Sequence, residues 1–252
     1  MQFKSLVVAT ALLVSGSLFA SVTETETFTF ELDDGGRFSL SNVNGSVTVT
    51  GASGNQVEIV ATKKADNQDD LDNIEIEISS SDNEIVVETE IGKSKSWFSF
   101  GGNNSGSVRY EVTVPANTLL DSIDTVNGDV SISGVSGKVV AESVNGDLEI
   151  QGLVDDANLS TVNGNIDAGF KKLEGSQDVK AETVNGRVSV TLPADADVEV
   201  SADTLNGSIN ARDFGLETDK GFVGSDLNGD IGSGSARLNI DTVNGSVKIR
   251  SH

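Results

Sequence analysis

The chain has 252 residues, enough for one large β domain or two small ones. Its 39 acidic and 17 basic side chains give a formal net charge of -22, which argues against nucleic acid and anionic lipid as partners. With 5% aromatic residues, 27 Gly and no Cys, the composition excludes a core of large rings and a disulfide framework.

Residues 1–20 have the features of a signal peptide. Residues 1–4 form a short basic region, residues 6–13 are apolar, and the small residue Ala20 precedes a plausible cleavage point. The apolar stretch is short for a membrane-spanning helix, and no Cys follows it to carry a lipid. We therefore expect an exported protein, in the periplasm or at the cell surface or outside the cell, with no membrane span after cleavage.

Residues 21–115 read as an N-terminal β region that includes the first turn of a repeat structure. Alternation of apolar and polar residues predicts strands within it, and an acid-rich stretch at 63–72 predicts a loop or a short helical turn. The expected strands cover residues 21–30, 38–49, 56–62 and 108–114, and a hairpin joins 74–78 to 85–91.

One aromatic cluster interrupts this region. Trp97, Phe98 and Phe100 lie among Lys, Ser, Gly and Asn, which is typical of an exposed loop that stacks on sugar rings or inserts into a partner. The alternative is a cap over the first turn of the repeat structure.

Residues 116–252 form one continuous domain with the preceding region and are dominated by a repeat. From residue 127 on, Asn-Gly recurs every 16 to 22 residues, each time after Val or Leu and two residues before Ile, Leu or Val, and such a period indicates a repeat architecture. The eight pairs are Asn44-Gly45, Asn127-Gly128, Asn145-Gly146, Asn163-Gly164, Asn185-Gly186, Asn206-Gly207, Asn228-Gly229 and Asn244-Gly245.

Two all-β folds fit the repeat. Asn-Gly between alternating runs is typical of hairpins, so an antiparallel hairpin array is one alternative. A hairpin sheet would expose the apolar residue before every Asn, whereas a bend could turn that residue inward together with the preceding Thr or Ser, with Gly at positive φ. We therefore predict a single-stranded parallel β-helix or β-solenoid with an N-terminal β-strand region, whose stacked corners align buried Asn side chains into ladders. The chain ends directly after its last strand, so we also expect an unpaired edge there and self-association.

The regularity of these pairs makes them structural corners and not ligand sites. A Thr or Ser lies two residues before six of the eight Asn residues and is expected to form an internal hydrogen-bonded row. Asp226 replaces it in one repeat as a buried or half-buried carboxylate. Acidic side chains alternate with these residues and are expected on the outer face. They are Asp124, Glu142, Glu182, Asp203 and Asp241, with Asp129, Asp147 and Asp230 following the Gly.

The residues argue against most catalytic chemistry. His252 is the only His and there is no Cys, so a Ser-His-Asp or Cys-His site and a transition-metal site are excluded, and we assign no catalytic residues and no cofactor. The repeated carboxylates leave a carbohydrate-active β-helix enzyme as an alternative, although a catalytic site should break the repeat. Their oxygens also allow weak Ca²⁺ binding.

The chain resembles the exported bacterial "putative adhesin" domain-of-unknown-function family over about residues 38–250. The resemblance rests on Val112-x-Val114-Pro115-Ala116, on the run from Asp124 to Val130, and on the recurring Val-Asn-Gly-x-Val. It implies a parallel β-helix-like fold, a cell-envelope location, no established enzymatic activity and no catalytic residues to carry over.

These observations predict an exported, non-enzymatic interaction protein that binds an unknown protein or glycan at the cell envelope. The alternatives are the carbohydrate-active enzyme and a structural or self-assembling envelope element.

Overall fold

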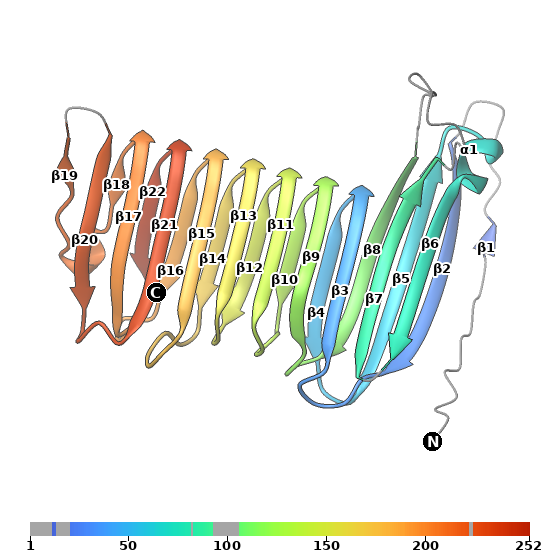
Figure 1. The fold of residues 1–252 in the computed structure, drawn as a ribbon, viewed down its shortest axis with the longest axis horizontal. Coiled ribbons are helices and arrows are strands. Elements are labelled where there is room, and N and C mark those ends of the chain that lie inside the picture. The colour runs from blue at the N-terminus through green and yellow to red at the C-terminus, as the bar shows by residue number, and fades with distance from the viewer. Residues whose placement is uncertain (1–11, 14–20, 82, 93–105, 222–223) are drawn as a thin grey trace.

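The computed structural model describes residues 12–13, 21–81, 83–92, 106–221 and 224–252, and its strands form two long sheets (Figure 1). Each sheet has eleven strands. In sheet A the order is β1-β2-β5-β8-β4-β10-β12-β14-β16-β22-β18, and in sheet B it is β19-β20-β17-β21-β15-β13-β11-β9-β3-β7-β6. The prediction of an all-β fold is confirmed, with two large and mostly parallel sheets.

The repeats build seven coils, each with one strand in sheet B followed by one in sheet A. The sheet B strands are β3 (Arg37–Asn44), β9 (Leu119–Asn127), β11 (Val139–Asn145), β13 (Ala157–Asn163), β15 (Asp178–Asn185), β17 (Val198–Asn206) and β21 (Ala236–Asn244). The sheet A strands are β4 (Val47–Ala52), β10 (Val130–Ser133), β12 (Leu148–Leu153), β14 (Ile166–Phe170), β16 (Val188–Leu192), β18 (Ile209–Asn210) and β22 (Val247–Ser251).

Neighbouring coils pair in parallel, with equivalent residues in register. Thr161 of β13, for example, pairs with Ser143 of β11 and with Thr183 of β15. An array of antiparallel hairpins is therefore wrong for the repeats, because each Asn-Gly connection carries the chain from one sheet to the other instead of back along the same sheet.

The coils do not stack in chain order. The last coil, β21–β22, lies between β15–β16 and β17–β18, and the coil β3–β4 lies between β9–β10 and the N-terminal strands. The C-terminus is consequently inside the stack (Figure 1). The expected unpaired edge at the last strand is wrong, because β22 pairs with β16 on one side and with β18 on the other.

Further strands, paired antiparallel with one another, close both ends of the stack. At the N-terminal end they are β1 (Leu12–Leu13), β2 (Val22–Glu31), β5 (Gln56–Ala65), β6 (Ile74–Ser81), β7 (Glu84–Ile91) and β8 (Gly106–Pro115). The β6–β7 hairpin and the helical turn, α1 (Gln68–Asp72), confirm the sequence predictions. At the other end β20 (Ser225–Ile231) runs antiparallel to β17, and β19 (Asp219–Lys220) pairs antiparallel with β20. The 3-10 turn η1 (Arg212–Phe214) follows β18.

The core is a thin layer between the inner faces of the two sheets. Alternate residues of each strand point into it, so that Leu159 of β13 and Ile166 of β14 are fully buried. Val, Ile, Leu and Ala fill most of this layer, as the composition predicts. The outward residues of sheet B alternate with these core residues and recur from coil to coil at the surface.

Candidate interaction surface

Seven of the eight Asn-Gly pairs connect the two strands of a coil, and their side chains form a hydrogen-bonded ladder. In six of the seven, the Asn Nδ2 donates to the Oδ1 of the Asn in the neighbouring coil at 2.8–2.9 Å, and Asn44 Nδ2 at the end of the ladder donates to the carbonyl oxygen of Gly106 at 3.1 Å. The asparagine ladder comprises, in spatial order, Asn44, Asn127, Asn145, Asn163, Asn185, Asn244 and Asn206. It is exposed from Asn127 on, so the expectation of buried Asn side chains is wrong, and it forms part of the surface.

The hydroxyl row lies directly beneath the ladder, and all its members are buried. Each hydroxyl donates to the carbonyl oxygen of the corner Gly in the adjacent coil at 2.9–3.4 Å. The row consists of Thr125, Ser143, Thr161, Thr183, Thr242 and Thr204. These bonds satisfy buried hydroxyls that would otherwise destabilise the fold, and they connect each coil to the next.

The corner glycines are required for close approach and, except at Gly45, not for positive φ. Gly45 has φ 117°, whereas the glycines of the other six corners lie outside the left-handed region, which corrects the expectation. A β-carbon built on Gly164 would lie 2.6 Å from the carbonyl carbon of Gly146 and closer still to its oxygen. Any side chain at these corners would therefore push adjacent coils apart.

In six of the eight repeats the apolar residue before the Asn points outward, which contradicts the prediction that it turns inward, whereas Leu227 before Asn228 is buried. In six coils this residue is 39% to 51% exposed, although its Thr or Ser neighbour is buried. We call this set the valine row: Val126, Val144, Val162, Val184, Val243 and Leu205. The strand keeps its alternation up to the Asn, so the residue after an inward Thr must face solvent.

Carboxylates form a second outward row on the same face. We call Asp124, Glu142, Glu182, Asp241 and Asp203 the acidic row. Each lies two residues before a member of the valine row, so both point to the same side of the sheet. Glu182, Asp241 and Asp203 occupy neighbouring strands in register, and burial followed by repulsion from Glu182 and Asp203 raises the pKa of Asp241. Lys180 Nζ lies 2.8 Å from Glu182 Oε1 and offsets this repulsion in part.

The pair Asn228-Gly229 is not a corner, which is a correction to the sequence prediction. It lies inside β20, where Asn228 is paired with Ser201 of β17 and accepts a hydrogen bond from its hydroxyl at 3.0 Å. Asp226 lies opposite Asp203, so it extends the outward carboxylates and does not replace an inward Thr. Its half-buried state agrees with the sequence prediction.

Asp129 and Asp147, two of the three acids expected after a corner Gly, serve local hydrogen bonding. Asp129 Oδ1 accepts from the backbone N–H of Asp147, and Asp147 Oδ1 accepts from the N–H of Asn165, at 2.8 and 2.7 Å. Asp230, the third acid of this set, is exposed in β20. These contacts join neighbouring coils in the same way as the asparagine ladder.

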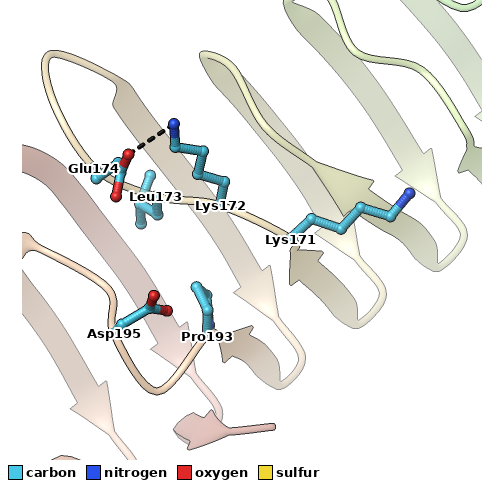
Figure 2. Close-up of a pocket in the computed structure, with 6 residues that line it drawn as sticks. All are labelled: Lys171, Lys172, Leu173, Glu174, Pro193 and Asp195. Atoms are coloured by element: carbon cyan, nitrogen blue, oxygen red, sulfur yellow. Dashed lines mark ion pairs between the residues drawn. The ribbon is translucent and has the colours of Figure 1, made fainter.

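A depression at the loop side of the stack has a volume of about 240 Å³ (Figure 2). Lys172 pairs with Glu174 at 2.6 Å across its rim, Pro193 and Asp195 face it from the neighbouring loop, and Lys171 points away. The single cation aimed at it is already neutralised, so the depression offers little to bind a charged ligand.

A group of acids at the N-terminal end comes close enough for metal binding. One carboxylate oxygen each from Glu75, Glu77 and Glu90 lies within 4.8 Å of the others, and all three residues are exposed. Exposed acidic groups commonly gather without an ion, so we assign no metal site, and weak Ca²⁺ binding stays a prediction. The expected ligand loop at Trp97, Phe98 and Phe100 and most of the expected signal peptide lie outside the described residues.

Comparison with known proteins gives the family. The family model described as Toastrack DUF4097 matches residues 105–250, which is more than half of the chain and includes all coils except β3–β4. The chain belongs to the Toastrack DUF4097 family. This membership confirms the resemblance to the "putative adhesin" family. No curated protein matches the chain in sequence.

Solved structures resemble this Toastrack chain at low identity. A "putative cell adhesion protein" from Clostridium sporogenes is 16% identical, with 90% of this chain and 100% of that chain covered and a TM-score of 0.48. A "putative adhesin" from Bacteroides fragilis is 17% identical, with 89% and 96% covered and a TM-score of 0.42. A "putative lipid binding protein" from Parabacteroides distasonis is 13% identical, with 90% and 96% covered and a TM-score of 0.30. Likenesses of this size carry no argument about function.

Among the described residues of this Toastrack chain, no helix has the length and apolar character to cross a bilayer. The functional candidate that sequence reasoning missed is the valine row. Strict alternation from the inward Thr would have found it, because Thr and the following Val cannot share a face in a regular strand.

Proposed function

We propose that this chain is an exported, non-enzymatic interaction protein of the cell envelope that acts in the manner of an adhesin. The observation that carries the proposal is the outer face of sheet B. Six neighbouring coils present the same exposed apolar position there, bordered by the asparagine ladder and, in five coils, by a carboxylate. A surface that repeats in this way suits attachment to an extended partner.

The same regularity weighs against a hydrolytic function. A catalytic pair of carboxylates would distinguish one coil from the others, because acid and base need different environments. The pKa of Asp241 is raised by its burial and by its position between Glu182 and Asp203, so this shift follows from the repeat itself. The features of residues 1–20 support export.

The proposal is tested by locating the protein in the cell and adding protease to intact cells. We expect the protein in the periplasm or at the surface, and we expect wild-type cells to attach to a host or envelope surface better than cells that lack the protein. A cytoplasmic location, or cleavage of a polysaccharide in a broad panel, would contradict the proposal.

A further inference from the structure

We propose that the outer face of sheet B binds a basic amphipathic helix of a partner protein. The apolar stripe of the helix would lie on the valine row, and its Lys and Arg side chains would face the acidic row. This inference rests on the proposed interaction function and names the chemistry of the partner.

Exposed large hydrophobic side chains are confined to one row of the molecule's described residues. Among the described residues, the six large hydrophobic side chains that are exposed are the members of the valine row. The outer face of sheet A, built on the same repeats, has no such row in the part of the chain that the structure describes. Contiguous exposed apolar surface on one face is a mark of an interaction site, whereas scattered apolar residues are not.

The charge of the same face favours a cationic partner. Within two outward positions of the valine row, the six coils carry the five carboxylates of the acidic row and one ammonium group, Lys180, which already pairs with Glu182. Like charges opposed across neighbouring strands destabilise a sheet. Cationic side chains from a partner would relieve that repulsion at Asp241, where Glu182 and Asp203 lie on either side.

The spacing of the row favours a helix over an extended segment. Six members at about 4.8 Å between strands span about 24 Å, which corresponds to about 16 residues of helix. Side chains on one face of a helix recur about every 5.4 Å along its axis, which is close to the distance of about 4.8 Å between neighbouring members of the valine row. Side chains on one face of an extended strand recur about every 6.8 Å, so after one coil they no longer align with the members of the valine row. A second copy of this chain would oppose one acidic row to another, which disfavours it as the occupant.

The test uses the purified protein and a labelled model helix of 18 residues, made of Leu on one face and Lys on the other. The control peptide keeps the Leu positions and replaces Lys by Glu. We expect saturable binding of the Lys peptide in fluorescence anisotropy, weakening as salt is raised, and no binding of the Glu peptide.

Matched variants test whether the Lys peptide binds to the outer face of sheet B. Val144→Thr, Val162→Thr and Val184→Thr together keep β-branched side chains, so the fold should survive while the affinity falls at least tenfold. The pair Glu142→Gln and Glu182→Gln should weaken binding at low salt and flatten its salt dependence. The pair Glu149→Gln and Asp167→Asn removes the same number of charges from the exposed outer face of sheet A, and it should leave binding unchanged.

Several results would overturn the inference. They are failure of the Lys peptide to bind, unchanged affinity in the folded triple Val variant, equal weakening by the sheet A pair, and a wild-type dimer that the triple variant abolishes. If peptide binding fails while cells still attach, only this inference is lost. If the peptide binds but the protein is neither exported nor needed for attachment, the proposed function is lost.

Discussion

The corner glycines provide the sharpest test of how the coils are held together. In Gly164→Ala the new β-carbon would meet the carbonyl group of Gly146 in the adjacent coil, 2.6 Å from its carbon. Real β-carbons essentially never come closer than 3.0 Å, so the coils must separate by at least 0.4 Å, and by more to clear the nearer oxygen. A side-chain rotation cannot relieve the clash, because the backbone fixes the position of the β-carbon and the carbonyl group is itself part of the backbone.

The cost follows from the hydrogen bonds that cross this gap. Gly146 N donates to Asn163 O at 3.1 Å, and Thr161 Oγ1 donates to Gly146 O at 3.0 Å. An opening of 0.4 Å brings the first to about 3.5 Å, where hydrogen bonds are largely lost. Two lost bonds and a buried carbonyl left without its partner predict a loss of about 3 to 5 kcal/mol in the free energy of unfolding.

Urea denaturation followed by circular dichroism measures this loss. Gly169→Ala is the matched control, because its β-carbon would meet only the end of the flexible Gln151 side chain, and its cost should stay below about 1 kcal/mol. Gly164→Asn should be as damaging as Gly164→Ala, although Asn tolerates positive φ. Equal stability of Gly164→Ala and Gly169→Ala, or rescue by Asn, would refute the close-approach explanation.

Three further predictions test the rows and the order of the coils. Thr161→Val should lower the free energy of unfolding by about 1 to 2 kcal/mol, measured by urea denaturation, because it leaves the carbonyl of the neighbouring coil without its hydroxyl donor. The pKa of Asp241 is raised, so its carboxyl favours folding most at low pH and this contribution is lost as the pH rises through the folded-state pKa. Asp241→Asn should therefore raise the thermal midpoint at pH 7 and give no gain at pH 3, and a gain of equal size at both values would contradict the repulsion. In a chain that ends before β21, protease should cleave β17 and β20 while β9 to β13 stay protected, because β21 is the strand that joins β17 to β15. Full protection of β17 would contradict the position of β21 between these two strands.

Much of the fold follows from local pattern. The alternation of apolar residues predicts the strands, and the period of Asn-Gly predicts that repeated coils stack. The hydroxyl row is likewise predictable, because a Thr such as Thr161 that faces a core needs a hydrogen-bond partner. Asn163 in the middle of the ladder shows why Asn suits the corner, since its amide both donates and accepts along the stack.

The order of the coils and the direction of the valine row could not be read in the same way. The motif of β21 is nearly the same as that of the other coils, so nothing local says that the last coil inserts between β15 and β17. Asn228-Gly229 shares the corner motif but lies in an antiparallel strand that closes the stack. The prediction that the chain bends at Val162 and turns this side chain inward was wrong, because the strand stays regular up to the Asn. Gly164 is needed there because it lies close to the backbone of the adjacent coil.

The central claim is that the outer face of sheet B is the binding surface, and attachment of labelled protein to isolated cell envelopes tests it most directly. Wild type, the triple Val144, Val162 and Val184→Thr variant, and the Glu149→Gln and Asp167→Asn control would be titrated under the same conditions. We expect wild type and control to saturate at the same concentration and the triple variant to bind at least tenfold more weakly. Equal binding of all three folded proteins would contradict the claim.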